Sequence, residues 1–136
     1  MLLLIRTSVT QSGRRENGES SMKFAVGYKV MLSYLDKIWE LTKSDSLAAL
    51  LGSMVLLSDG YPIDVAIKND WNRAVEIAKT HVANNAPTSE LAYRSALVYL
   101  KNWLDIAIDA EIENVYLELL NCKHPEIWKC AVSKIL

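Results

Sequence analysis

The sequence predicts an all-α fold of about six helices. Apolar residues recur at spacings of three and four throughout the chain after residue 22, which is typical of helices that bury one face. The period-two alternation of a half-buried strand forms no sustained run in this region. Helix caps and turn residues, such as Ser44, Asp59-Gly60 and Pro125, separate the apolar stripes.

The first expected helix covers about 23–43, and the second covers about 45–56. Ser44 is a good N-cap for the second helix, and Asp45 faces the positive end of its dipole. Gly52 lies inside this helix, where glycine costs about 1 kcal/mol relative to alanine. We therefore expect a close contact between helices at Gly52. The stripe of the first helix contains Phe24, Tyr28, Met31, Leu35 and Ile38.

Four further helices are expected after a turn at 58–62. Asp64 is positioned to cap the first of them, and Thr88 or Ser89 the second. Pro125 suits the first position of the last helix because its missing N–H needs no partner there. These helices are expected at about 65–82, 89–108, 111–121 and 125–135.

Two motifs recur along the chain. Tyr-(Lys/Arg)-x-x-Leu-x-Tyr-Leu occurs at 28–35 and again 65 positions later at 93–100, and Trp-x-x-Ala-Val occurs at 71–75 and again 57 positions later at 128–132. These matches raise the hypothesis of two pseudo-symmetric three-helix units, the second being shorter in the turn before its Trp helix. Amphipathic helices also share composition by chance, so that alternative stays open. The two units would be 22–83 and 88–136.

The start of the chain differs from the rest. Residues 7–21 are polar and rich in Ser and Gly, and they carry too little apolar surface to order themselves. We expect residues 1–21 to be a leader or a disordered arm, and residues 22–136 to form a single helical domain. The alternative is a short strand or arm at 2–9 that docks on the core.

Composition excludes several classes of function. The net charge of −1 without clustered Lys and Arg argues against a nucleic-acid partner. No segment approaches the ~20 apolar residues of a membrane span, and the apolar run at 1–5 is too short for a signal peptide. Cys122 and Cys130 are expected as free thiols, so we expect a cytoplasmic protein.

No residue pattern indicates catalysis, a cofactor or a metal. The chain lacks a phosphate-binding loop and a GxSxG turn, and Cys122, His124 and Cys130 lack the spacing of a four-ligand zinc site. We therefore expect no enzyme. Three acidic residues near the end of the chain are expected on a solvated helix face: Glu111, Glu113 and Glu118.

Residues 28–75 resemble a group of small all-helical bacterial proteins. The shared pattern is Ser-Asp-x-Leu-x-x-Leu-Leu-Gly-x-Met at 44–54, then Asp-Gly-x-Pro-x-Asp at 59–64, then Asp70-Trp71. Proteins of this kind resemble immunity proteins, which neutralise a toxin in contact-dependent inhibition systems. The second half of the chain lacks the Leu-Leu-Gly-x-Met and Asp-Gly-x-Pro elements.

This resemblance implies a stoichiometric inhibitor that occludes a cognate toxin, most simply a nuclease with a basic cleft. Acidic residues near the helix junctions would contact it, and Trp39 is the candidate aromatic anchor. Each aspartate also has an ordinary role as a cap or turn residue. The alternative function is a helical interaction module or homo-oligomer without a toxin partner. The candidate partner-binding aspartates are Asp45, Asp59, Asp64 and Asp70.

Overall fold

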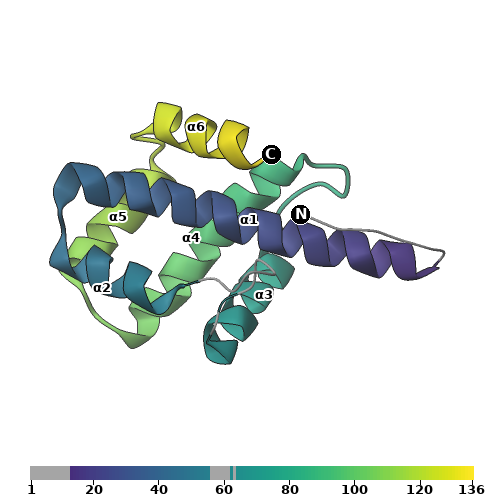
Figure 1. The fold of residues 1–136 in the computed structure, drawn as a ribbon, viewed down its shortest axis with the longest axis horizontal. Helices are drawn as coiled ribbons and strands as arrows, with labels where there is room; N and C mark the ends of the chain where they lie inside the picture. Colours follow the sequence, from purple (N-terminus) through teal and green to yellow (C-terminus); the bar gives the residue numbers. More distant parts are fainter. Residues whose placement is uncertain (1–12, 56–61, 63) are drawn as a thin grey trace.

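The computed structural model describes residues 13–55, 62 and 64–136, with side chains described from residue 25 onward. Within these residues the chain forms six α-helices and no strand (Figure 1), which confirms the predicted all-α class. None of the described helices is both long and apolar enough to cross a membrane. The helices are α1 (Gly13–Thr42), α2 (Asp45–Ser53), α3 (Val65–Lys79), α4 (Thr88–Ile106), α5 (Ala110–Leu120) and α6 (Pro125–Ile135).

Five of the six helices begin within one residue of their predicted starts. The exception is α1, which begins at Gly13 and so extends back into the polar segment that we expected to precede the domain. Residues 1–12, which contain the remainder of the expected leader or arm, lie outside the described residues. The predicted turn at 58–62 also falls outside them, apart from Pro62.

The helix caps follow the predictions at two of three places. The Ser44 hydroxyl accepts a hydrogen bond from the Leu47 N–H at 3.1 Å, and the Asp64 carboxylate accepts one from the Ala66 N–H at 2.9 Å. The predicted cap of α4 by Thr88 or Ser89 is wrong. Pro87 takes the N-cap position, because its fixed φ of −60° with ψ of 152° already supplies the extended entry to the helix.

Helices α1 and α4 form the centre of the molecule (Figure 1). We call α1–α3 the first half and α4–α6 the second half. The last helix of each half packs on the first helix of the other half, so α3 contacts α4 and α6 contacts α1. Each central helix also contacts the helix that follows it, α2 or α5. This exchange of third helices joins the two halves through one core.

A glycine allows the central helices to approach closely, but it is not the predicted one. A Cβ atom on Gly27 of α1 would lie 3.2 Å from Trp71 Cζ2 and 3.5 Å from Ala92 Cβ of α4. A Cβ atom on Gly52 would meet nothing within 4 Å. The predicted contact at Gly52 is therefore wrong, because this residue lies on the exposed face of α2.

The Tyr and Trp side chains make matching contacts in the two halves. The Tyr28 hydroxyl donates to the Met54 carbonyl at 3.1 Å, and 65 positions later the Tyr93 hydroxyl donates to the Leu119 carbonyl at 2.6 Å. Trp71 packs edge-on against Tyr28 and Tyr99, with ring centroids 5.5 and 6.0 Å apart. Trp128 packs in the same way against Tyr93 and Tyr34, at 5.5 and 5.6 Å.

The second helices of the two halves also correspond. Ser44 caps α2, and 65 positions later Asp109 caps α5 by accepting from the N–H groups of Glu111 and Ile112. The connection to the third helix is longer in the first half, at 54–64, than in the second, at 121–124. These correspondences support the two-unit hypothesis. The buried positions that match are Leu47 with Ile112, Leu50 with Val115 and Met54 with Leu119.

Candidate binding surface

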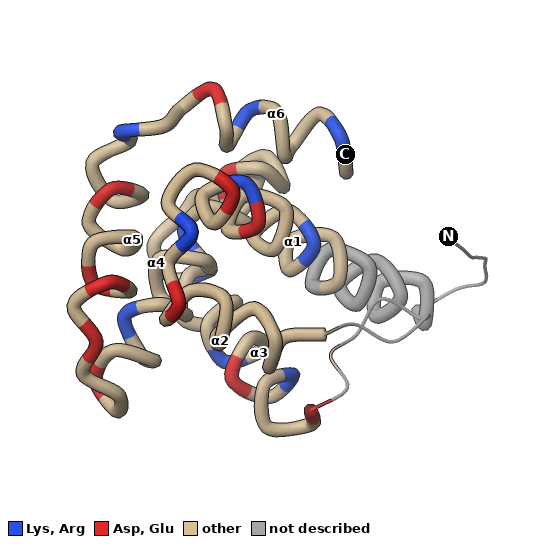
Figure 2. Tube along the Cα trace, turned by 60° about the vertical axis from the view of Figure 1, so that its left-hand side comes forward, with Lys and Arg blue, Asp and Glu red and all other residues tan. Residues whose placement is uncertain are grey.

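Negative charge is concentrated in one segment of the chain, residues 105–120, which we call the acidic segment. It contains five carboxylates and no Lys or Arg, whereas the whole chain has a net charge of only −1. The rest of the chain therefore has an excess of positive side chains. Figure 2 shows the acidic residues along α5 and the turn before it. They are Asp105, Asp109, Glu111, Glu113 and Glu118.

The ion pairs of the acidic segment lie at its two ends. Asp105 pairs with Lys101 at 3.5 Å. Glu118 approaches Lys123 at 3.9 Å and His124 Nε2 at 3.0 Å. The Asp105–Lys101 pair is largely exposed, so it contributes at most about 1 kcal/mol to stability. The centre of the segment is held by neutral hydrogen-bond donors instead.

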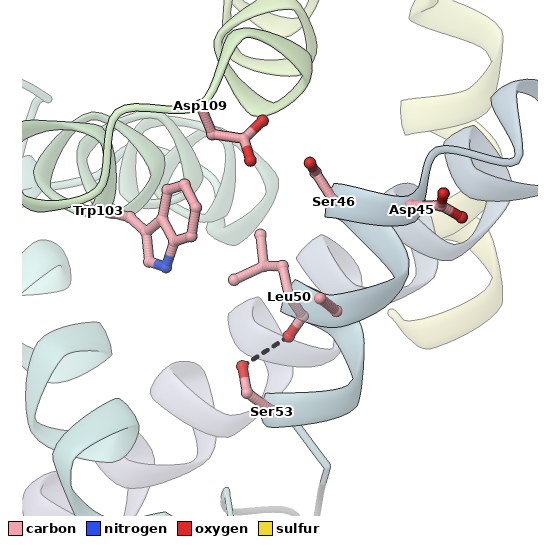
Figure 3. A pocket seen from close by; sticks show the side chains of 7 residues that line it. Asp45, Ser46, Leu50, Ser53, Trp103 and Asp109 are labelled. Atoms are coloured by element: carbon pink, nitrogen blue, oxygen red, sulfur yellow. Dashed lines mark hydrogen bonds between the residues drawn. The ribbon is translucent and has the colours of Figure 1, made fainter.

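Those neutral donors come from the start of α2, which meets the start of α5. Glu111 accepts hydrogen bonds from the Ser44 hydroxyl and, at 3.3 Å, from the Ser46 N–H. The Ser46 hydroxyl, followed by the N–H groups at the start of α5, lowers the pKa of the Asp109 carboxyl. The Ser46 and Asp109 side chains point toward each other across this junction (Figure 3). Asp109 is therefore an ionised acceptor whose orientation is fixed.

A shallow groove of about 400 Å³ lies beside this junction, between α2 and the end of α4. Trp103 stands on one side of the groove and Leu50 faces it from α2, with Asp109 at one end (Figure 3). The lining contains no Lys or Arg, so the groove combines an apolar wall with a negative rim. Its lining residues are Asp45, Ser46, Ala49, Leu50, Ser53, Trp103 and Asp109.

Apolar side chains are also exposed in the acidic segment. Ile106, the last residue of α4, is 88% exposed, and Ile108, in the turn that leads to Asp109, is 98% exposed. Leu117 and Leu120 on α5 are also exposed. Single exposed apolar residues are common, but this set shares one segment with five carboxylates. Such a mixture of apolar and acidic side chains suits a protein partner with a basic surface.

The structure separates the partner-binding residues that the sequence suggested. Asp45 lines the groove together with Trp103 and Asp109, whereas Asp64, the N-cap of α3, and Asp70 on α3 lie outside it. The ring of Trp39 is covered by Lys43, whose Nζ lies 4.1 Å from the ring centroid. Asp59 lies outside the described residues. The suggested residues thus form no single surface among those described.

Sequence reasoning missed the residues that the structure does bring together. Asp109 was not identified as a cap, and Glu111 and Glu113 were assigned only to a solvated face. The signal was available in the charge count, because 105–120 is a long window without a single basic residue. The sequence did not predict that Ile106 and Ile108 are exposed, because both fit the apolar pattern of the buried face of a helix.

The fold and this surface together define a helical protein with one acidic, apolar-edged face. Comparison with protein-family models, with curated proteins and with solved structures finds no match to the chain. Cys122 and Cys130 are exposed and unbridged. Among the described side chains, no three His, Cys, Asp or Glu residues are grouped so that they could hold a metal ion.

Proposed function

We propose that this protein is an immunity protein that binds a cognate bacterial toxin in the cytoplasm and neutralises it by stoichiometric occlusion. The toxin would be a nuclease, whose substrate cleft is basic because it must bind phosphates. The observation that carries the proposal is the acidic segment, with five carboxylates, no basic residue and two nearly fully exposed isoleucines. No residue of the protein would turn over a substrate in this role.

The acidic segment suits such an interface in two ways. Its carboxylates would accelerate encounter with a basic cleft, because complementary charge steers association. Ile106 and Ile108 would supply the apolar contact that gives an interface its desolvated centre. The fold itself does not require so many acidic side chains, because α2 occupies the corresponding place in the first half with only one acidic residue, Asp45.

A second candidate is a homo-oligomeric module, which the exposed isoleucines also favour. Self-association through the acidic segment would bring like charges together unless a basic patch of a second copy faced it. Sedimentation equilibrium of the purified chain separates the two candidates. A monomer at micromolar concentration supports the toxin-binding proposal, and a dimer that Ile108→Asp dissociates supports the module.

Co-expression with the toxin encoded beside the gene tests the proposed function. Cells should survive with the wild-type protein and die without it. Glu113→Lys, an exposed change on α5, should weaken protection, mainly by slowing association. Asp36→Lys is the matched control, because it makes the same charge change at an exposed position of α1. Death of cells that express the wild-type protein would contradict the proposal.

The same assay locates the interface. If Asp70→Lys on α3 abolishes protection while Glu113→Lys does not, the interface lies at the earlier-suggested aspartates and not on the acidic segment. Circular dichroism of each variant shows whether a loss of protection reflects a loss of folding.

A further inference from the structure

We infer that the groove between α2 and the end of α4 receives a basic amphipathic helix of the protein partner. This inference rests on the proposed function and deepens it, because it names the kind of element that the protein would recognise on the toxin. The apolar face of that helix would lie along α2 against Leu50 and Trp103, and its basic flank would face the acidic segment.

The groove follows one side of α2 for about two turns. Trp103 of α4 stands on the other side of the groove (Figure 3). A shallow groove along a helix suits the face of a second helix, whereas a small molecule needs a concave pocket that encloses most of its surface. The lining residues from α2 recur at spacings of three and four, and they are Ser46, Ala49, Leu50 and Ser53.

Small side chains keep this side of α2 open. Ala49 is exposed, and the Ser53 hydroxyl donates a hydrogen bond back to the Leu50 carbonyl at 2.7 Å (Figure 3). An incoming helix could therefore pack at the usual distance of about 8–10 Å between helix axes. Trp103 is only partly buried, so part of its ring is available for apolar contact with that helix.

The corresponding place in the second half contains larger side chains. Two small residues that line the groove from α2 are replaced on α5 by an asparagine and a glutamate, and a buried isoleucine of α1 corresponds to the partly buried tryptophan of α4. The packing that the two halves share therefore requires neither the small residues nor the accessible ring. The positions that pair at an offset of 65 are Ala49 with Asn114, Ser53 with Glu118, and Trp103 with Ile38.

Backbone hydrogen bonding favours a helix over an extended segment as the occupant. The described part of the chain contains no strand, so an extended segment would find no sheet edge to pair with there. Its N–H and C=O groups would lie against the apolar wall of the groove without partners, which costs free energy. A helix satisfies these groups internally and presents only side chains to the wall.

The charge expected of the occupant follows from the acidic segment. Asp109 lies at one end of the groove, whereas the Asp45 carboxylate points away from it, so the negative charge is on the side of α5 (Figure 3). Glu113 adds a further exposed carboxylate on α5, and no Lys or Arg lines the groove. A helix with Lys or Arg on the flank that faces α5 would be attracted, and an acidic helix would be repelled.

A peptide titration of the ¹⁵N-labelled full chain tests the inference directly. The probe is a peptide of Leu and Lys, about five helical turns long, whose leucines recur at spacings of three and four residues. One control has the same composition in an order without an apolar face, and the other has Glu in place of each Lys. The amide resonances of 46–53 and the indole N–H of Trp103 should shift in a saturable way with the probe and with neither control. No shift at these positions, larger shifts on α3, or equal shifts with a control would overturn the inference.

Two neighbouring alanines of α2 provide a matched pair of variants. Ala49 lines the groove and Ala48 does not, although both are exposed. Ala49→Arg fills the groove, whereas Ala48→Arg makes the same change of size and charge beside it. Arginine is a good helix former, so both variants should fold, which circular dichroism verifies. Ala49→Arg should weaken peptide binding by about tenfold or more and Ala48→Arg should change it by less than about twofold, because only the first obstructs the site. Equal effects would place the peptide elsewhere and overturn the inference.

Co-expression with the proposed toxin partner separates this inference from the proposed function. Ala49→Arg should lose protection, and Ala48→Arg should retain it. If the wild-type protein and Ala49→Arg protect equally, the helix site is wrong and the proposed function stands. If the wild-type protein does not protect, the proposed function fails, and the peptide titration alone decides whether the groove binds a basic helix.

Discussion

In the first half of the molecule Tyr28 binds the Met54 carbonyl and packs on Trp71; in the second half Tyr93 and Trp128 repeat both contacts. The environments are not identical, because Trp71 is only 2% exposed while Trp128 is partly exposed. The half with the more exposed tryptophan is also the half with the shorter connection before its last helix, α6. The same contacts therefore support a deeply buried core in one half and a shallower one in the other.

The outer faces of α2 and α5 differ far more than their buried faces. Ala48 and Gly52 are exposed on α2, and the corresponding exposed positions on α5, 65 residues later, are Glu113 and Leu117. In this pair of helices the positions that match are buried, and the positions that diverge most are exposed. The buried pattern that α2 and α5 share therefore does not account for the acidic and apolar outer face of α5.

The largest expected effect tests the unequal burial of the two tryptophans. Trp71→Ala should reduce the free energy of unfolding by about 3–5 kcal/mol, because it empties a fully packed site. Trp128→Ala should cost roughly half as much, since part of its ring is already in water. Urea titrations measure both values. Equal losses, or a larger loss at Trp128, would contradict the described difference between the halves.

Substitutions at two helical glycines are expected to have opposite effects on stability. Gly27→Val should destabilise the protein by about 1–3 kcal/mol, because a side chain there meets Trp71 and Ala92 within 3.5 Å. Gly52→Ala should stabilise it by about 1 kcal/mol, since the site is open and alanine is the better helix former. Thermal unfolding monitored by circular dichroism shows both. Destabilisation by Gly52→Ala would mean that α2 packs against something at this position.

The hydrogen bonds of Tyr28 and Tyr93 are expected to contribute unequally to the free energy of unfolding. Tyr28→Phe should cost about 1–2 kcal/mol, because it leaves the buried Met54 carbonyl without its partner. Tyr93→Phe should cost less, about 1 kcal/mol, since the Leu119 carbonyl still accepts from the Cys122 N–H at 3.2 Å once the hydroxyl is gone. Urea unfolding at neutral pH checks this order, and a reversed order would contradict it.

Alkaline pH provides an independent test of the same tyrosines. Burial, together with the hydrogen bond to Cys122, raises the pKa of Tyr93 to about 12 from 10, and burial raises the pKa values of Tyr28, Tyr34 and Tyr99 further. Because each folded-state pKa exceeds the unfolded value, this stabilisation is complete below pH 10 and is lost as the pH rises through 12 and beyond. The free energy of unfolding should therefore fall above pH 10, and tyrosinate absorbance should appear together with unfolding. The chain has six tyrosines, so the ionisation of more than two of them near pH 10 in a folded chain would show that these four rings are accessible.

The smallest effect concerns Ser95, the counterpart of Val30 in the first half. Both residues are fully buried, but the Ser95 hydroxyl has no hydrogen-bond partner among the described groups. Ser95→Ala should therefore leave stability unchanged or raise it by up to about 1 kcal/mol. Differential scanning calorimetry resolves the change. A loss of more than 1 kcal/mol would show that the hydroxyl does have a partner.

The helices were predictable because their signals are local. Ser44 and Asp64 cap helices through residues two or three positions away, and such spacing is visible in the sequence. The start of α1 was not predictable from apolar periodicity, since residues 13–21 carry almost none. The close approach at Gly27 also escaped prediction, because it depends on Trp71 and Ala92 from other helices.

The candidate surface was less predictable than the fold. Asp45 was identified, but its neighbours Trp103 and Asp109 come from a segment more than fifty residues away and reach it only through the packing of α2 with α5. The carboxylates of α5 looked like an ordinary solvated face when α5 was considered alone. Comparison with α2, which has the same buried pattern and little charge, marks them as unusual, as does the absence of Lys and Arg from 105–120.

Hydrogen exchange of this chain, alone and mixed with the proposed toxin partner, tests the central claim most directly. If the divergent face of the second half is the interface, amide protection should increase in 105–120 and at the start of α2. The exposed face of α3, which carries Asp70, should be unchanged. Protection confined to α3, or no protection anywhere with an active toxin present, would contradict this account.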